Sequence, residues 1–324
     1  MEATFAERLK RHQAAWAAKR VGNGGALQMD GIHDWVLRDR RDNYFESAWA
    51  AWLDGKAHLW GHALNSSQAF AINLFGPARQ DPAVAKALWA KLWVGPALAP
   101  DHHVTVCFEY SGESRATTRD YLGEQGQPTQ VDVAFKAHDG NSTAILLIEV
   151  KLSEAEFGSC RGPAEHSRDK ENHTCDDARR VLSNPAQHCW LAAVEKRKYW
   201  QLLTDPENGL SVTATKQGRC PWSGGLYQLM RNWSLGRALV ESNEAQHVEV
   251  AVCLHPWNDK ASVLHDPVAG THDVIRAFNS MTRTASIREI DPRAVVEVSV
   301  SAGASTSWGT YMSKRYFCPQ LSPK

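Results

Sequence analysis

A near-continuous apolar run, Thr143–Val150, constrains the fold of this chain more than any other segment. A strand this apolar is expected to be covered on both faces, as at the centre of a sheet that lies between layers of helices. Gln130–Phe135 precedes it with alternating side chains, and Asp139-Gly140-Asn141 between the two segments is a strong turn signal. The sequence therefore predicts a β-hairpin at the centre of an α/β fold.

Asp132 and Glu149 are expected to project from the same face of this hairpin. If Gly140-Asn141 form a two-residue loop, Asp132 lies directly opposite Glu149; an Asp139-Gly140 loop shifts the pairing by two residues and keeps both on one face. Directly opposed residues have Cβ atoms ~4.5–5.5 Å apart, where like charges repel. A divalent cation such as Mg²⁺ between the carboxylates would remove this repulsion, so the pair predicts a metal site.

Lys151 lies two residues beyond Glu149 and shares its face of the strand. Beside a metal site its ammonium group would orient or deprotonate a water molecule, with its pKa lowered by the cation. A simpler interpretation is that Glu149 and Lys151 only mark where a buried strand reaches solvent, and that Asp132 is an unrelated edge charge.

Hydrophobic periodicity predicts the remaining elements. Phe45, Trp49 and Trp52 form one apolar stripe of a helix over about 43–53. Further helices are expected over 1–20, from 65–67 to 76, and over 81–93, 186–203, 227–240 and 273–280, and further strands over 104–110, 247–254 and 295–300. We expect one domain over 1–324, made of a helical N-terminal part (1–100), a core sheet (101–151 and 227–300) and a cysteine-bearing insertion (152–222).

The carboxylate pair and its lysine resemble a known family signature. Asp132 followed by Ile148-Glu149-Val150-Lys151 is similar to the Asp-X(n)-Glu-X-Lys motif of the PD-(D/E)XK nuclease superfamily, with Val131 in place of the usual proline. Members of that superfamily often carry a glutamate on the first core helix that points at the metal, and Glu46 resembles it. The segments 65–75 and 227–232 are similar to a bacterial branch of restriction-endonuclease-like proteins, and the resemblance covers about 42–254.

The resemblance implies a restriction-endonuclease-like mixed sheet flanked by helices and a metal-dependent nuclease that hydrolyses phosphodiester bonds of DNA. Asp132, Glu149 and the main-chain carbonyl of Val150 would hold Mg²⁺ or Mn²⁺, Lys151 would position the attacking water, and Glu46 would complete the metal shell. Cutting both strands of a duplex would favour a homodimer. The alternative is a non-catalytic protein with a degenerate nuclease fold, which binds nucleic acid or another partner.

Gln228 and Arg231 are further candidates on the helix expected over 227–240. They lie one helical turn apart, and in a nuclease they would contact phosphate. Equally, they would cap that helix or pair across it.

Four of the seven cysteines fall in the polar segment 152–222: Cys160, Cys175, Cys189 and Cys220. A segment with too few apolar residues to fold alone suggests a metal that holds it together. Some PD-(D/E)XK nucleases hold an iron–sulfur cluster (4Fe–4S) through widely separated cysteines, which makes such a cluster one candidate. Zinc is the other, with His166 or His173 replacing a thiol, and four unrelated free cysteines are the third possibility.

Composition and charge limit the function classes. The 36 basic and 36 acidic side chains cancel, so a surface that binds nucleic acid must be local. No stretch approaches the ~20 apolar residues of a membrane span, and the N-terminus lacks an apolar signal-peptide centre, so a cytoplasmic location is expected. The sequence contains no Gly-x-Ser-x-Gly motif, which argues against a serine hydrolase.

Overall fold

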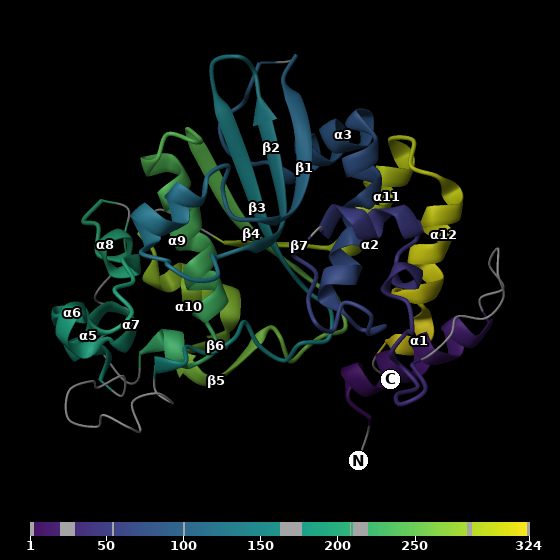
Figure 1. The fold of residues 1–324 in the computed structure, drawn as a ribbon, viewed down its shortest axis with the longest axis horizontal. Coiled ribbons are helices and arrows are strands. Elements are labelled where there is room, and N and C mark those ends of the chain that lie inside the picture. The colour runs from purple at the N-terminus through teal and green to yellow at the C-terminus, as the bar shows by residue number, and fades with distance from the viewer. Residues whose placement is uncertain are drawn as a thin grey trace.

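The computed structural model describes residues 3–19, 30–53, 55–99, 101–162, 177–207, 209, 220–283 and 287–322 (Figure 1). Its α-helices are α1 (Phe5–Lys19), α2 (Ser67–Gln80), α3 (Pro82–Leu92), α5 (Ala178–Ser183), α6 (Pro185–His188), α7 (Trp190–Ala193), α8 (Tyr199–Leu203), α9 (Tyr227–Glu241), α10 (Val274–Met281), α11 (Pro292–Ser301) and α12 (Thr306–Arg315). Short 3-10 or π segments are η1 (Arg40–Asn43), η2 (Ser47–Leu53), η3 (Thr117–Tyr121), η5 (Pro221–Ser223) and η6 (Pro319–Leu321). None of the helices in these ranges is long and apolar enough to cross a membrane.

A mixed five-stranded sheet forms the centre of the fold, in the order β1-β2-β3-β4-β7. The strands are β1 (His103–Tyr110), β2 (Val131–His138), β3 (Thr143–Lys151), β4 (His247–Leu254) and β7 (Arg288–Ile290), and β5 (Val263–Val268) pairs with β6 (Thr271–Asp273) in a separate ribbon. β1, β2 and β3 are antiparallel neighbours, whereas β4 is parallel to β3 and β7 is parallel to β4. This mixed sheet flanked by helices confirms the predicted α/β architecture.

Both faces of β3 are covered, as its apolar run predicts. Leu146, Ile148 and Val150 pack into a core formed with α2, α3, α11 and α12. Ile145 and Leu147 pack into a second core formed with α8, α9 and α10. Figure 1 shows these helices as two lobes on either side of the sheet, with α1 in the first lobe. Residues of odd number in β3 therefore face α9.

The C-terminal segment differs from its predicted structure. Its β-branched residues predict a strand over 295–300, but the chain forms helix α11 there. Asp291 accepts a hydrogen bond from Arg293 N at 2.8 Å, and Pro292 occupies the first helical position. This capping signal outweighs the β propensity of the valines that follow.

Two predicted helices are shorter or broken. The helix expected over 43–53 is reduced to the 3-10 segments η1 and η2, because Phe45 N donates to the side chain of Asn73 at 2.7 Å rather than to a helical carbonyl. The helix expected over 186–203 is divided into α6, α7 and α8. Cys189 has extended backbone angles between α6 and α7, and this residue ends the first helix.

A buried arginine ties the C-terminal helix to the loops of the first lobe. Arg315 in α12 is fully buried and donates to the main-chain carbonyls of Asn43 at 2.8 Å and Leu64 at 3.1 Å. The side chain of Asn43 in turn donates to the carbonyls of Gly61 at 2.9 Å and Ala63 at 2.8 Å. These bonds fix the 61–64 segment, which precedes α2, against the C-terminal helix.

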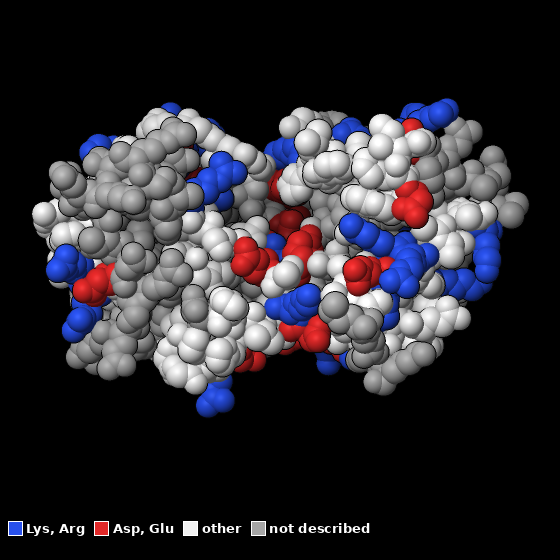
Figure 2. All heavy atoms as spheres, turned by 90° about the horizontal axis from the view of Figure 1, so that it is seen from below, with Lys and Arg blue, Asp and Glu red and all other residues white. Residues whose placement is uncertain are grey.

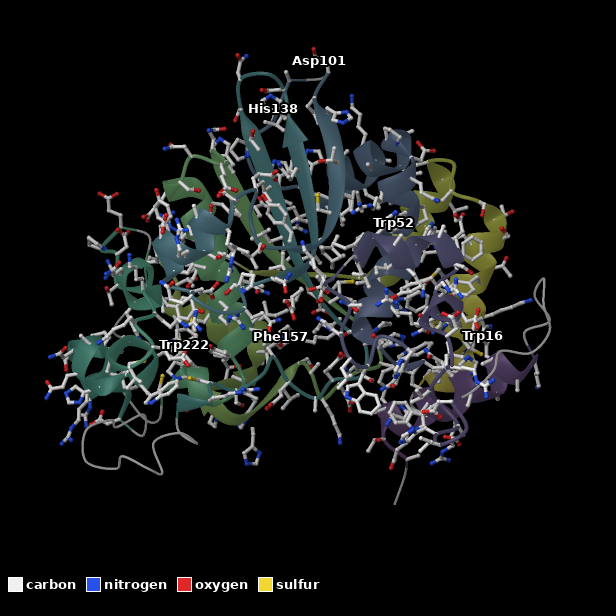
Figure 3. The ribbon with its side chains drawn as sticks, viewed as in Figure 1. Trp16, Trp52, Asp101, His138, Phe157 and Trp222 are labelled. Atoms are coloured by element: carbon white, nitrogen blue, oxygen red, sulfur yellow. The ribbon has the colours of Figure 1, made fainter. Side chains whose placement is uncertain are left out.

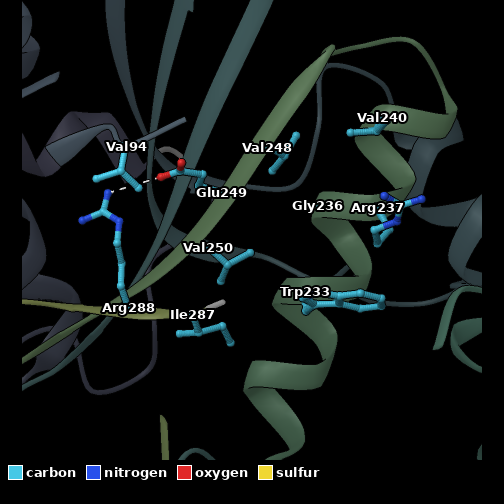
Figure 4. A pocket seen from close by; sticks show the side chains of 10 residues that line it. All are labelled: Val94, Trp233, Gly236, Arg237, Val240, Val248, Glu249, Val250, Ile287 and Arg288. Atoms are coloured by element: carbon cyan, nitrogen blue, oxygen red, sulfur yellow. Dashed lines mark hydrogen bonds and ion pairs between the residues drawn. The ribbon is translucent and has the colours of Figure 1, made fainter. Parts of the chain in front are cut away.

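The edge of β4 is only partly covered. β7 pairs with β4 over Ala251–Cys253, and the preceding residues of β4 line a pocket against α9 with a volume of about 270 Å³ (Figure 4). Gly236 permits close packing of α9 there, since a Cβ atom at this position would lie 3.1 Å from Val248 Cγ1. Arg288 and Glu249 form an ion pair at 3.5 Å across the opening. No residue that the sequence predicts for catalysis or for metal or nucleic-acid binding lines this pocket.

Candidate active site

Three carboxyl side chains meet at one end of the sheet. β2 and β3 pair in the register predicted for a two-residue loop, with Val133 opposite Ile148. Asp132 and Glu149 are the next residues of the two strands beyond this last pair. On the other side of β2, Glu109 of β1 lies across from Asp132. The ends of three neighbouring strands therefore gather acidic residues that are far apart in the sequence.

Glu149 and Lys151 form a buried ion pair held by helix α9. Lys151 Nζ lies 2.9 Å from Glu149 Oε1, and both side chains are at least 93% buried. Gln228 Oε1 accepts a hydrogen bond from the same ammonium group at 2.6 Å, and Asn232 Nδ2 donates to Glu149 Oε2 at 2.6 Å. Gln228 and Asn232 are four residues apart on α9, so one face of the helix holds both charged groups.

The Asp132 carboxylate is held by a main-chain N–H group instead of a charged side chain. Its Oδ2 accepts a hydrogen bond from Val150 N at 2.7 Å. Burial, and then the neighbouring carboxylates of Glu149 and Glu109, raise the pKa of Asp132 well above its ordinary value. Burial alone would lower the pKa of Lys151, but Glu149, Glu154 and Asp132 outweigh it and raise the pKa. The cluster therefore holds more negative charge than Lys151 neutralises.

Glu109 breaks the regular alternation of β1. Its φ of 50° lies in the left-handed region, which costs a non-glycine residue about 1–3 kcal/mol. Phe108 packs into the core beside α2 whereas Tyr110 packs into the core beside α9, although residues two apart in a regular strand share a face. The Glu109 carboxylate accepts a hydrogen bond from Gln68 Nε2 at 2.6 Å and lies 3.6 Å from His58 Nε2. The strained backbone thus directs a third carboxylate toward α2 at the end of the sheet.

The loop between η2 and α2 contributes two basic side chains at the edge of the cluster. Lys56 Nζ donates to the main-chain carbonyl of Glu109 at 3.0 Å, and His58 N donates to Gln68 Oε1 at 3.0 Å. The His58 side chain is 52% exposed. The neighbouring Glu109 carboxylate raises the pKa of His58, and the Glu149 carboxylate contributes in the same direction.

The cluster lies at the lower end of the sheet, toward a furrow between the lobes. Figure 3 places His138, the last residue of β2, at the upper end, and Phe157 below the sheet between the lobes. The Phe157 ring centroid lies 5.4 Å from Lys151 Nζ. Figure 2 views the molecule from below, and shows acidic side chains gathered in the furrow with basic side chains beside them. The ring of Phe157, which contacts Lys151, thus places the cluster on the side of the sheet that faces this furrow.

One family model matches residues 30–317, and its description is Restriction Endonuclease associating with ARP, or REase-ARP. The chain belongs to this family. No curated protein and no solved structure matches it. The matched range of the REase-ARP model contains the whole five-stranded sheet together with α2 and α9.

Two residues predicted for the site of this REase-ARP protein lie elsewhere. Glu46 is exposed, and its Oε2 accepts a hydrogen bond from Gln80 Nε2 at 2.9 Å. Gln80 is the last residue of α2 and Gln68 the second, so Glu46 is ~18 Å along the helix from the cluster. Arg231 lies 3.7 Å from the buried Glu124 carboxylate and donates to Thr129 Oγ1 at 3.0 Å. It therefore pairs with the segment between η3 and β2, whereas Gln228 reaches Lys151.

The cysteines of the REase-ARP chain are only partly described. Cys175, His166 and His173 lie outside the described residues. Cys160 N donates to Trp222 O at 2.8 Å, and burial raises the pKa of the Cys160 thiol to about 11, with Cys189 adding to this effect. Among the described residues, no three His, Cys, Asp or Glu side chains form a group that could hold a metal ion.

Three residues at the site of the REase-ARP chain were not predicted from sequence motifs: Gln68, Glu109 and Asn232. A single acidic residue within the apolar strand 104–110 was a usable signal for Glu109. Asn232 lies one turn from Gln228 and on the same side of α9, which the helical period could have indicated. Gln68 has no signal in the sequence, because it stands at the start of a helix where polar residues are common.

Proposed function

We propose that this chain is a divalent-metal-dependent nuclease of the PD-(D/E)XK type, which hydrolyses phosphodiester bonds of DNA. The observation that supports it most is the common face of Asp132 and Glu149, with Lys151 paired to Glu149 at 2.9 Å. The family description names a restriction endonuclease, which favours nucleic acid as the substrate. A restriction-endonuclease-like arrangement of strands is also compatible with the mixed sheet.

The donor set suits a hard cation. Asp132 and Glu149 offer carboxylate oxygens, and the pKa of Asp132 is raised by burial and by its acidic neighbours, so an added positive charge would relieve the repulsion. The two carboxylates and the Val150 carbonyl would hold Mg²⁺ or Mn²⁺ together with water ligands. When bound, the cation would neutralise negative charge that develops on the phosphate during the reaction.

The residues around the carboxylates would position water and substrate and would stabilise negative charge on the phosphate. The ammonium group of Lys151 would orient water and stabilise charge on the phosphate. Gln228 and Asn232 hold Lys151 and Glu149 in place. His58 and Lys56, at the exposed edge, are well placed to contact phosphate groups of a bound strand.

Lys151→Met is expected to lower the rate of Mg²⁺-dependent cleavage of DNA by about 10²–10³-fold, since it removes a charge that acts in the transition state. Plasmid and single-stranded circular DNA with Mg²⁺, Mn²⁺ or EDTA provide the assay. Lys136→Met is the matched control, because Lys136 lies on the same face of β2 as Asp132 and four residues from it, and pairs with Glu113. The control is expected to cleave at the wild-type rate.

Equal cleavage by both variants, or none by wild-type protein with either metal, would contradict the proposal. DNA binding without cleavage would instead favour the alternative, a non-catalytic protein with a degenerate nuclease fold. The ratio of nicked to linear plasmid reports on whether two copies of the chain act together, as a homodimer would.

The cysteine segment carries a separate proposal, in which Cys160, Cys175, Cys189 and Cys220 bind an iron–sulfur cluster or zinc. The described residues alone do not complete such a site, so the proposal depends on Cys175 and no catalytic step uses it. Anaerobically purified protein is expected to contain about four iron atoms, with a broad visible absorption band, or about one zinc ion per chain. Cys189→Ser is expected to lose this metal and Cys253→Ser, buried in β4, to retain it. Metal-free wild-type protein would contradict the proposal.

A further inference from the structure

Trp60 stands on the same loop as Lys56 and His58 and is one of the most exposed aromatic residues of the described chain. Its exposed fraction is 53%, and that of the preceding Leu59 is 82%. Burying apolar surface stabilises folded proteins, so large exposed aromatic groups are typical of binding surfaces. Two residues span at most ~7 Å, so Trp60 is close to His58 and hence to the carboxylate cluster.

The Trp60 ring belongs to a rigid aromatic surface. Trp60 and Trp35 are stacked, with ring centroids 6.2 Å apart and planes inclined by 27°. His33 lies edge-on to Trp35 at 5.5 Å and to Trp60 at 6.3 Å, and His62 lies edge-on to Trp60 at 6.2 Å. We call Trp35, Trp60, His33 and His62 the aromatic platform.

Main-chain bonds hold the platform in place. Leu64 N donates to Trp35 O at 2.9 Å and Leu37 N donates to His62 O at 3.0 Å, so the two segments of the platform are paired. Asp30 Oδ1 accepts hydrogen bonds from the main-chain N–H groups of Ile32 at 2.8 Å and His33 at 2.7 Å. Little conformational entropy is therefore lost when a flat ligand stacks on the platform.

One lysine contacts the platform and another stands on the loop that carries Trp60. Lys10 Nζ is 4.0 Å from the centroid of the Trp35 ring, and the exposed Lys56 lies four residues before Trp60. An exposed indole that stacks on Trp35, with Lys10 over the Trp35 ring and basic residues on the same loop, matches an unpaired nucleobase with its charged backbone. A purely apolar protein partner would leave the two ammonium groups without anionic partners.

We propose that the aromatic platform binds an unpaired nucleobase by stacking on Trp60, so that the adjoining phosphate lies near the carboxylate cluster. This inference rests on the proposed nuclease function and specifies its substrate as single-stranded or locally unpaired nucleic acid. A base within a duplex is stacked on both faces, so it must leave the helix before it reaches Trp60.

The test measures binding without cleavage. Fluorescence anisotropy with labelled oligonucleotides, single-stranded or duplex, is recorded with the Asp132→Asn protein in EDTA. Trp60→Ala in this background is expected to weaken single-strand binding by about 5- to 150-fold, the range for loss of one stacked base, and to leave duplex binding nearly unchanged. Trp60→Phe keeps a flat ring and is expected to retain most of the affinity.

Leu59→Ala is the matched control, since Leu59 is more exposed than Trp60 and lies beside it but cannot stack. Equal losses from Leu59→Ala and Trp60→Ala would overturn the proposal in favour of a general apolar docking surface. A change in the oligomeric state of both variants would assign the surface to a second copy of the chain. Unchanged single-strand binding by Trp60→Ala would also overturn it.

The outcomes separate this inference from the nuclease function. Wild-type cleavage together with Trp60-independent binding refutes only the platform. Trp60-dependent binding by a wild-type protein that cleaves nothing refutes only the nuclease. The unfolding temperature of each variant is measured alongside, and that of Leu59→Ala is expected to stay at the value of the Asp132→Asn protein because the Leu59 side chain is exposed.

Discussion

Asp132→Asn is expected to abolish cleavage and, at the same time, to make the protein more stable at neutral pH in EDTA. Cleavage should fall by about 10³-fold or more, because one of two proposed metal ligands is lost. Asparagine keeps an oxygen that can accept the hydrogen bond from Val150 N at 2.7 Å. It also removes the charge that burial and the Glu149 and Glu109 carboxylates disfavour, and the gain is on the order of 1–2 kcal/mol.

The stability difference is expected to depend on pH in one direction. The pKa of Asp132 is raised in the folded chain. Such a group contributes stability that is fully present below its unfolded pKa of about 3.9 and is lost as pH rises through the folded pKa. The wild-type and Asp132→Asn proteins should therefore have similar free energies of unfolding near pH 4 and diverge above it. Urea unfolding between pH 4 and 8 measures this.

Divalent metal should reverse the order of stability. A ligand that binds only the folded protein at 100 times its dissociation constant stabilises it by about 2.7 kcal/mol. Mg²⁺ or Mn²⁺ is therefore expected to raise the unfolding temperature of wild-type protein and not of Asp132→Asn. Asp101→Asn is the control, since Asp101 is exposed at the opposite end of the sheet (Figure 3). A wild-type protein that is insensitive to both metals would argue against a cation at Asp132.

Arg315→Ala is expected to lower the free energy of unfolding by about 3–5 kcal/mol. The substitution leaves a cavity and removes the donors to the Asn43 and Leu64 carbonyls. It also removes a guanidinium group that lies 4.9 Å from the Trp16 ring centroid and 4.8 Å from that of Tyr316. Urea unfolding followed by circular dichroism gives the free energy.

Arg293→Ala provides the comparison for Arg315, because Arg293 is 51% exposed and pairs with Asp291 at the protein surface. Its loss is expected to change the free energy of unfolding by no more than ~0.5 kcal/mol. Similar losses from the two variants would mean that the buried network contributes no more than a surface ion pair. Cleavage by Arg315→Ala should also fall, since the network fixes the segment that follows the His58 loop.

The sequence was most informative where turn residues and side-chain alternation agree with the face of the strand that must be buried in the core. The Gly140-Asn141 turn and the alternation of β2 set the register that brings Asp132 opposite Glu149. The run 247–254 was predicted as a strand and forms β4 over those residues. In both cases the period of the side chains decides which face is buried, and a shift by one residue would expose the whole apolar face.

The sequence was less informative where a single contact decides the backbone. The valines of α11 favour a strand until Asp291 and Pro292 are weighed as a helix start. Glu109 reaches the cluster through a left-handed φ of 50°, which no hydrophobic period reveals. Glu46 was selected by its place in a motif, and its distance from the cluster follows from the length of α2, which Gly76 and Pro77 do not interrupt.

The parallel pairing of β3 with β4 also sets the order in which a newly made chain becomes competent. Lys151 precedes Gln228 by 77 residues, so at about 5–20 residues per second a ribosome supplies the helix that holds it ~4–15 s later. β4 follows later still, and residues 152–246 must loop out before it can join the sheet. A nascent chain therefore carries the acidic residues and the lysine before the helix that aligns them has been made.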